Sequence, residues 1–129
     1  MQLEQAPEDR PKPRVLVIED DDRLRRIIAM NLAARGHAVR EAADVMQGLA
    51  ALAEALPDLL ILDLSLPDGT GWDVLRGSAL PAHVRTVVVT AATVDPRLLA
   101  EFHQVAYLPK PFSMGALLRL TESRDGAAR

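Results

Sequence analysis

Short apolar runs alternate along this chain with segments of helical hydrophobic periodicity. Five runs are predicted to be strands, at 15–18, 37–42, 59–62, 84–89 and 105–108. The first and third are wholly apolar, as expected for strands that are buried on both faces. Because strands and helices alternate, we predict an α/β domain, doubly wound, with helices on both faces of a five-stranded parallel sheet.

Capping and turn residues place the helices between these strands. Asp21 or Asp22 can cap a first helix, which ends at Gly36, and Asp44 can cap a second one. The other three helices are expected near Trp72–Gly77, near Pro96–His103 and from about Ser113. The first helix should bury one side, formed by Leu24, Ile27, Ile28, Leu32 and Ala34, and Met46 and Met114 are interpreted as core fillers.

The length and composition favour one cytoplasmic domain. A chain of 129 residues fits a single domain at 14–121, with a disordered tail at 1–13 and a frayed end at 122–129. The chain has no cysteine, no apolar leader and no apolar run long enough to span a membrane. Its net charge of −3 gives no reason to expect direct binding to nucleic acid or to a membrane surface.

Chemically complementary residues follow the predicted strands. Glu19 and Asp20 follow the first, Asp63 the third, Thr90 the fourth and Lys110 the fifth. In a parallel sheet these positions share one edge, where ligands of such sheets bind. Clustered carboxylates repel one another unless a cation lies between them, and oxygen ligands without cysteine favour Mg²⁺. Carboxylates, a divalent ion, a lysine and a hydroxyl are the groups that phosphoryl transfer requires.

Each of these residues also has an ordinary explanation when it is taken singly. Glu19 and Asp20 could be helix caps, Asp63 a turn former, Thr90 a strand residue and Lys110 a solvated surface lysine. What those explanations leave out is that complementary groups stand at four strand ends. The combination therefore favours a phosphoryl-transfer site.

Four motifs give the chain a family resemblance. They are VLVIEDD (Val15–Asp21), DLLILDLSLPDGTG (Asp58–Gly71), TVVVTA (Thr86–Ala91) and YLPKPF (Tyr107–Phe112). In this order and spacing they resemble the receiver domain of bacterial two-component response regulators over residues 14–119. The resemblance implies the flavodoxin-like (βα)5 receiver fold with sheet order 2-1-3-4-5.

The resemblance also implies a role for each site residue. Asp63 would accept the phosphoryl group, and Thr90 and Lys110 would contact it. The metal ligands for Mg²⁺ would be Asp20, Asp63 and the backbone carbonyl of Ser65, with Glu19 acting through a water. Tyr107 would be an aromatic switch that turns inward when Thr90 moves, and the Lys110–Pro111 peptide bond would be cis.

A phosphorylation-activated signalling switch is the implied function. A histidine kinase or phosphotransfer protein, or a small donor such as acetyl phosphate, would supply the phosphoryl group. Catalysis would be limited to the protein's own phosphorylation and dephosphorylation, so the chain would not be an enzyme in the usual sense. The surface of the fourth helix, last strand and last helix would then change for an unknown downstream protein.

One departure from the family bears on assembly. The LPDGTG loop resembles receivers that are fused to winged-helix DNA-binding domains, which commonly pair through charged residues near the last strand. Here His103-Gln104-Val105-Ala106 precedes Tyr107 and contains no acid. We therefore expect a monomer or a weak dimer.

Two other functional classes compete with this interpretation. One is a Mg²⁺-dependent aspartyl phosphatase or phosphotransferase, but such enzymes carry a second acid two residues after the nucleophile, where Ser65 stands here. The other is an interaction module that works without phosphorylation. The presence of all five site residues argues against it.

Overall fold

The computed structural model describes residues 12–102 and 105–122. Most of the predicted terminal tails, 1–13 and 122–129, and the end of the predicted fourth helix at His103 lie outside these residues. The helices are α1 (Asp22–Ala34), α2 (Val45–Glu54), α3 (Gly71–Ser78), α4 (Pro96–Ala100) and α5 (Met114–Glu122). The strands are β1 (Val15–Ile18), β2 (Val39–Ala42), β3 (Leu59–Asp63), β4 (Ser65–Leu66), β5 (Gly69–Thr70), β6 (Arg85–Thr90) and β7 (Val105–Pro109).

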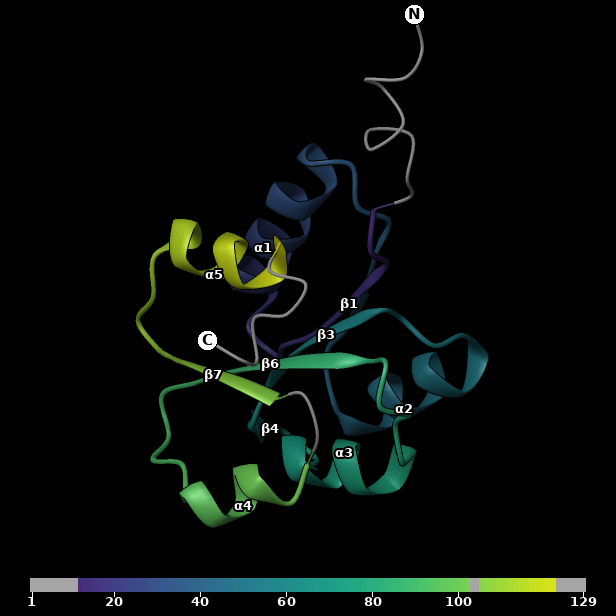
Figure 1. The fold of residues 1–129 in the computed structure, drawn as a ribbon, viewed down its shortest axis with the longest axis vertical. Coiled ribbons are helices and arrows are strands. Elements are labelled where there is room, and N and C mark those ends of the chain that lie inside the picture. The colour runs from purple at the N-terminus through teal and green to yellow at the C-terminus, as the bar shows by residue number, and fades with distance from the viewer. Residues whose placement is uncertain (1–11, 103–104, 123–129) are drawn as a thin grey trace, which may run out of the picture.

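Five of the strands form one parallel sheet, in the order β2-β1-β3-β6-β7. Counted within this sheet, the order is 2-1-3-4-5, as predicted. In Figure 1, α1 and α5 lie on one side of the sheet, and α2, α3 and α4 lie on the other. The doubly wound α/β prediction is thus confirmed.

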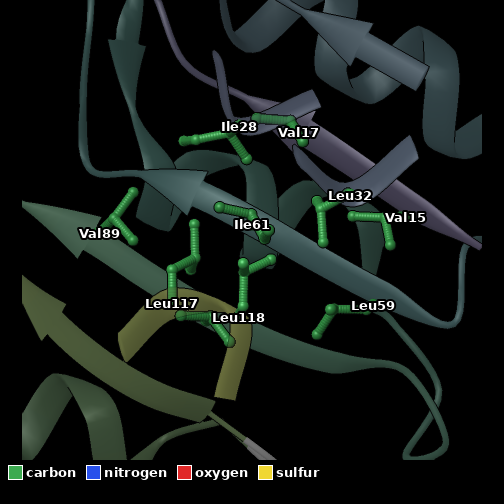
Figure 2. Close-up of a cluster of buried hydrophobic side chains, with 10 residues drawn as sticks. Val15, Val17, Ile28, Leu32, Leu59, Ile61, Val89, Leu117 and Leu118 are labelled. Atoms are coloured by element: carbon green, nitrogen blue, oxygen red, sulfur yellow. The ribbon is translucent and has the colours of Figure 1, made fainter. Parts of the chain in front are cut away.

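Each face of the sheet has its own apolar core. Figure 2 shows the first core, in which Val17 and Ile61 of the sheet meet Ile28 of α1 and Leu117 of α5. The second core joins the other face to α2 and α3, and Trp72 and Phe102 pack at its edge. Their rings stack with centroids 5.7 Å apart and connect α3 to the end of α4. Because alternate residues of β1 and β3 serve opposite cores, these strands have to be apolar throughout.

The caps fix where the helices begin. The carboxylate of Asp21 accepts hydrogen bonds from the amides of Arg23 and Leu24, so Asp21 is the cap of α1. Asp44 caps α2 as predicted, and Thr70 forms a capping box with Asp73 at α3.

Several predictions were wrong in detail. Met46 is 74% exposed, so it is not a core filler, whereas Met114 does pack against the first core. Ile27 and Ala34 lie exposed on α1. The buried stripe of this helix follows Ile28 and Leu32, which are one turn apart, so Ile27 falls beside the stripe. The turn-rich segment after Asp63 contains a small antiparallel hairpin of β4 and β5, which the sequence did not predict.

Candidate functional site at the carboxyl end of the sheet

The register of the sheet brings the ends of β1, β3, β6 and β7 together. Ile18 of β1 pairs with Leu62 of β3, so Glu19 and Asp63 end neighbouring strands. On the other side, Asp63 pairs with Val89, and Thr90 pairs with Pro109, the residue before Lys110. The juxtaposition of strand ends that the sequence predicted is therefore present.

Lys110 joins two of the carboxylates. Its Nζ atom lies 2.8 Å from Oε1 of Glu19 and 2.8 Å from Oδ2 of Asp63. The side chains of Glu19 and Asp63 are only 1% and 5% exposed. Both are buried among complementary charges, as a buried acid requires.

Backbone amides hold the remaining oxygen of each of these carboxylates. The amide of Asp21 donates to Oε2 of Glu19 at 3.0 Å, and the amide of Ser65 donates to Oδ1 of Asp63 at 3.0 Å. Every carboxylate oxygen of Glu19 and Asp63 thus has a donor. The two side chains are fixed in orientation before any ligand arrives.

A cation would find three oxygen ligands here. Glu19, Asp20 and Asp63 each offer one carboxylate oxygen, and these three oxygens lie within 4.8 Å of one another. Asp20 is exposed, so the cluster opens to solvent at that residue. Three carboxylates against the single ammonium of Lys110 leave two formal negative charges, and hard oxygen ligands of this kind suit Mg²⁺. The residues present therefore fit a divalent cation.

The pKa values of Glu19 and Lys110 are both raised, but for different reasons. Burial raises the pKa of Glu19 to about 7, although the hydrogen bonds from Lys110 and from the amide of Asp21 act to lower it. The charge of Asp63 raises it further. Burial alone would lower the pKa of Lys110, but its hydrogen bonds with Asp63 and Glu19 raise that pKa above its ordinary value. Lys110 therefore remains a cation at neutral pH.

Thr90 and Tyr107, the two residues predicted to form a switch, lie in different surroundings. Thr90 is buried, and its hydroxyl oxygen accepts a hydrogen bond from the amide of Ala92 at 3.2 Å. Tyr107 is among the large side chains that are exposed at the surface. The backbone carbonyl of Thr90 accepts a hydrogen bond from the amide of Lys110 at 2.9 Å, which links the two strand ends. The Lys110–Pro111 bond is cis, as expected.

The sequence reasoning missed two residues that support the site. Arg25 of α1 binds the backbone carbonyl of Glu19, and Asp68 of the β4–β5 turn binds the first amides of α2. A signal for Arg25 was present, because its spacing of three from Asp22 is that of a helical ion pair. Asp68 gave no such signal, since its partners are more than 20 residues away in the chain.

Within the ranges that the structure describes, no helix has both the length and the apolar character that crossing a membrane requires. The pattern of the family model named "Response regulator receiver domain" matches residues 15–122.

Curated relatives support the same grouping. The chain is 37% identical over 118 residues to the KDP operon transcriptional regulatory protein KdpE of Escherichia coli, covering 88% of this chain and 52% of that protein. It is 33% identical to the DNA-binding dual master transcriptional regulator RpaA of Synechocystis, covering 91% of this chain and 54% of that protein. The chain therefore spans about half the length of these relatives.

Solved structures show the same fold. A CheY-like response regulator receiver domain protein from Methanospirillum hungatei superposes with a TM-score of 0.77 at 25% identity, covering 84% of this chain and 89% of that one. The receiver domain of the Francisella response regulator 1452 superposes with a TM-score of 0.76 at 21% identity, covering 92% of this chain and all of that one (100%). The fold, the family pattern and the relatives agree: this chain belongs to the response regulator receiver domain family.

Proposed function

We propose that this receiver domain is switched by Mg²⁺-dependent phosphorylation of Asp63. The observation that carries the proposal is the contact of one ammonium group, that of Lys110, with both Glu19 and Asp63 beside the exposed carboxylate of Asp20. This arrangement supplies a nucleophile, a cation site and a fixed positive charge within a few ångströms. Those are the groups that phosphoryl transfer requires.

In the proposed reaction, a carboxylate oxygen of Asp63 forms a new bond to phosphorus. The P–N bond of a phosphohistidine donor, or the P–O bond of acetyl phosphate, breaks in the same step, and the leaving group keeps the bonding electrons. Lys110 would move from Oδ2 of Asp63 to a phosphoryl oxygen. Mg²⁺, held by Asp20, Asp63 and the Ser65 carbonyl, with Glu19 acting through a water, would balance charge on the phosphoryl oxygens.

The proposed switch uses Thr90 and Tyr107. The Thr90 hydroxyl would leave the amide of Ala92 and donate to the new phosphoryl group, and the exposed Tyr107 ring would turn inward to take up the space released. The surface of α4, β7 and α5 would then favour a second arrangement. The weak attachment of α4, none of whose residues is buried, supports this assignment.

The partners follow from the same chemistry. A histidine kinase or a phosphotransfer protein would donate the phosphoryl group, and a downstream protein would read the altered surface. The DNA-binding relative RpaA is nearly twice as long as the span that matches it. Because this chain carries a net charge of −3, we propose that it does not contact nucleic acid itself. We place the domain in the cytoplasm, as a monomer or weak dimer.

The test is phosphorylation by acetyl phosphate with and without Mg²⁺, followed by intact-mass measurement. The wild type should gain one acid-stable, base-labile phosphoryl group, and Asp63→Asn should gain none. Asp58→Asn is the matched control, because Asp58 directly precedes the opposite end of β3 and accepts a hydrogen bond from the amide of Arg14. It should be phosphorylated like the wild type.

Two results would contradict the proposal. Release of phosphate in excess of protein, with no phosphoryl group detectable on Asp63, would indicate a phosphatase or phosphotransferase. A wild type that gains no phosphoryl group would indicate a module that works without phosphorylation.

A further inference from the structure

Arg25 connects three segments beside the proposed metal site. Its guanidinium donates to the backbone carbonyl of Glu19 at 2.8 Å, to the carboxylate of Asp22 at 2.8 Å and to that of Glu41 at 3.1 Å. These partners lie at the end of β1, at the start of α1 and on β2. The side chain is only 12% exposed, although it belongs to a charged residue on the first turns of a helix. A long arginine held on three sides loses most of its freedom, so these contacts define one geometry.

The contact with the Glu19 carbonyl matters because of the peptide it belongs to. That peptide joins Glu19 to Asp20, two of the three residues whose carboxylates converge. Since a peptide unit is planar, holding its carbonyl orients the whole unit and so restrains the backbone from which both side chains leave. The amide of Glu19 donates to the carbonyl of Ala42 at 3.0 Å, so β2 holds the N–H of this residue while Arg25 holds its carbonyl.

We propose that Arg25 is a positioning residue for the acidic site, which sets the direction of the Glu19 and Asp20 carboxylates by holding the peptide between them. The inference rests on the proposed Mg²⁺ site and extends it to a residue on α1. It is distinct from a role in charge balance, because the two roles predict opposite effects of mutation.

Removing a positive charge beside a cation site should tighten cation binding if charge is what matters. Removing the clamp should weaken binding, because the carboxylates then have to be ordered when the ion binds. Arg25→Lys keeps the charge but lacks the fork of donors, whereas Arg25→Met removes both. If Arg25 positions the site, both variants weaken binding. If it only balances charge, Arg25→Lys leaves binding unchanged and Arg25→Met tightens it.

The experiment measures Mg²⁺ binding to the unphosphorylated full chain by titration calorimetry. Loss of one charge-assisted hydrogen bond should raise the dissociation constant for Mg²⁺ about tenfold in both Arg25 variants. Arg26→Met is the matched control. Arg26 is the next residue, it is 67% exposed, and its contact with Glu41 is a long 3.9 Å. This control loses the same charge without losing the clamp, so its affinity should equal or slightly exceed that of the wild type.

A second readout separates positioning from loss of folded protein. The initial rate of phosphorylation by acetyl phosphate is measured against Mg²⁺ concentration. Weaker positioning shifts the concentration at half-saturation and leaves most of the plateau rate intact. Partial unfolding would also shift that point, because Mg²⁺ favours the folded chain, so urea unfolding without Mg²⁺ is used to measure the folded fraction of each variant. A variant that is fully folded without Mg²⁺ and shows no shift would overturn the role of Arg25. If Arg25→Met does not fold, the measurement is made on Arg25→Lys alone.

The outcomes are separable from those of the proposed function. Wild-type protein that binds no Mg²⁺ would overturn the proposed function and this inference together. Wild-type protein that binds Mg²⁺, with Arg25→Lys and Arg25→Met binding as tightly as Arg26→Met, would overturn the role of Arg25 alone.

Discussion

Gly71 lies against the backbone of the proposed phosphorylation residue. A Cβ atom at this position would lie 2.7 Å from the carbonyl oxygen of Asp63 and 2.9 Å from the side chain of Leu64. The amide of Gly71 also donates to the carbonyl of Leu64 at 3.0 Å. Helix α3 therefore begins in direct contact with the end of β3, and even a methyl group would have to displace that strand end.

We predict that Gly71→Ala lowers the free energy of unfolding by about 1–3 kcal/mol, because the added methyl overpacks a buried contact. The same displacement should slow phosphorylation of Asp63. Urea unfolding and the acetyl phosphate assay measure the two effects. Gly115→Ala is the control, since the nearest atom that a Cβ there would meet, in the Arg119 guanidinium, lies at an ordinary 3.6 Å. Equal stability of the two variants would contradict the prediction.

At the scale of elements, the first turn of α2 is capped from a distant loop. The two carboxylate oxygens of Asp68 accept hydrogen bonds from the amides of Val45 at 2.8 Å and Met46 at 3.1 Å. Asp44 accepts from the amide of Gln47 at 2.7 Å. The hydrogen bond from Val45, followed by that from Met46, lowers the pKa of Asp68 below its ordinary value of 3.8. The loop after β3 is thereby tied to α2 on the same side of the sheet.

This contact predicts a pH-dependent contribution to stability. Because the folded state lowers the pKa of Asp68, the ionised carboxylate stabilises the fold above pH 3.8, and that contribution is lost as the pH falls through the folded-state pKa. Asp68→Asn should therefore lower the midpoint of urea unfolding at pH 6, by an amount that shrinks toward pH 3. A difference from the wild type that stays constant over this range would show that charge on Asp68 does not matter.

Among the elements, the long strands could be predicted from the sequence, but the short hairpin and the exposed face of α2 could not. The strands were predictable because each is a contiguous run whose composition reports burial on both faces. The β4–β5 hairpin was not, since two-residue strands are too short for periodicity and the segment contains the Pro and Gly of an ordinary turn. Likewise, the exposure of Met46 depends on which way α2 faces, and Asp68 helps to fix that through contacts 22 residues away in the chain.

For the whole molecule, the sequence predicted which strand ends form the site, but it did not predict the contacts between their side chains. The rule that parallel strands end at one edge brings Glu19, Asp63 and Lys110 together without any knowledge of distances. Lys110 contacts both acids, and Arg25 of α1 holds the carbonyl of Glu19. Both contacts depend on side-chain directions that no local sequence pattern encodes. These details follow only from the assembled fold.

Metal binding should stabilise the whole fold. A ligand that binds only the folded chain raises the free energy of unfolding by about 2.7 kcal/mol when its concentration is about 100 times its dissociation constant. We therefore expect Mg²⁺ to raise the urea midpoint of the wild type, and EDTA to reverse the effect. Asp20→Asn removes the exposed ligand and should abolish most of the response. The same Mg²⁺-induced shift in both proteins would exclude Asp20 from the site.

The ion pair of Lys110 with Glu19 spans 91 positions of the chain, nearly from the first strand to the last. During synthesis, a nascent chain that ends before Lys110 can hold its acids but not the cation that neutralises them. The proposed site is thus completed last, when β7 docks at the sheet edge and Lys110 reaches both acids. Under the proposed function, a truncated product would lack the lysine that contacts Asp63, and it should respond poorly to a phosphoryl donor.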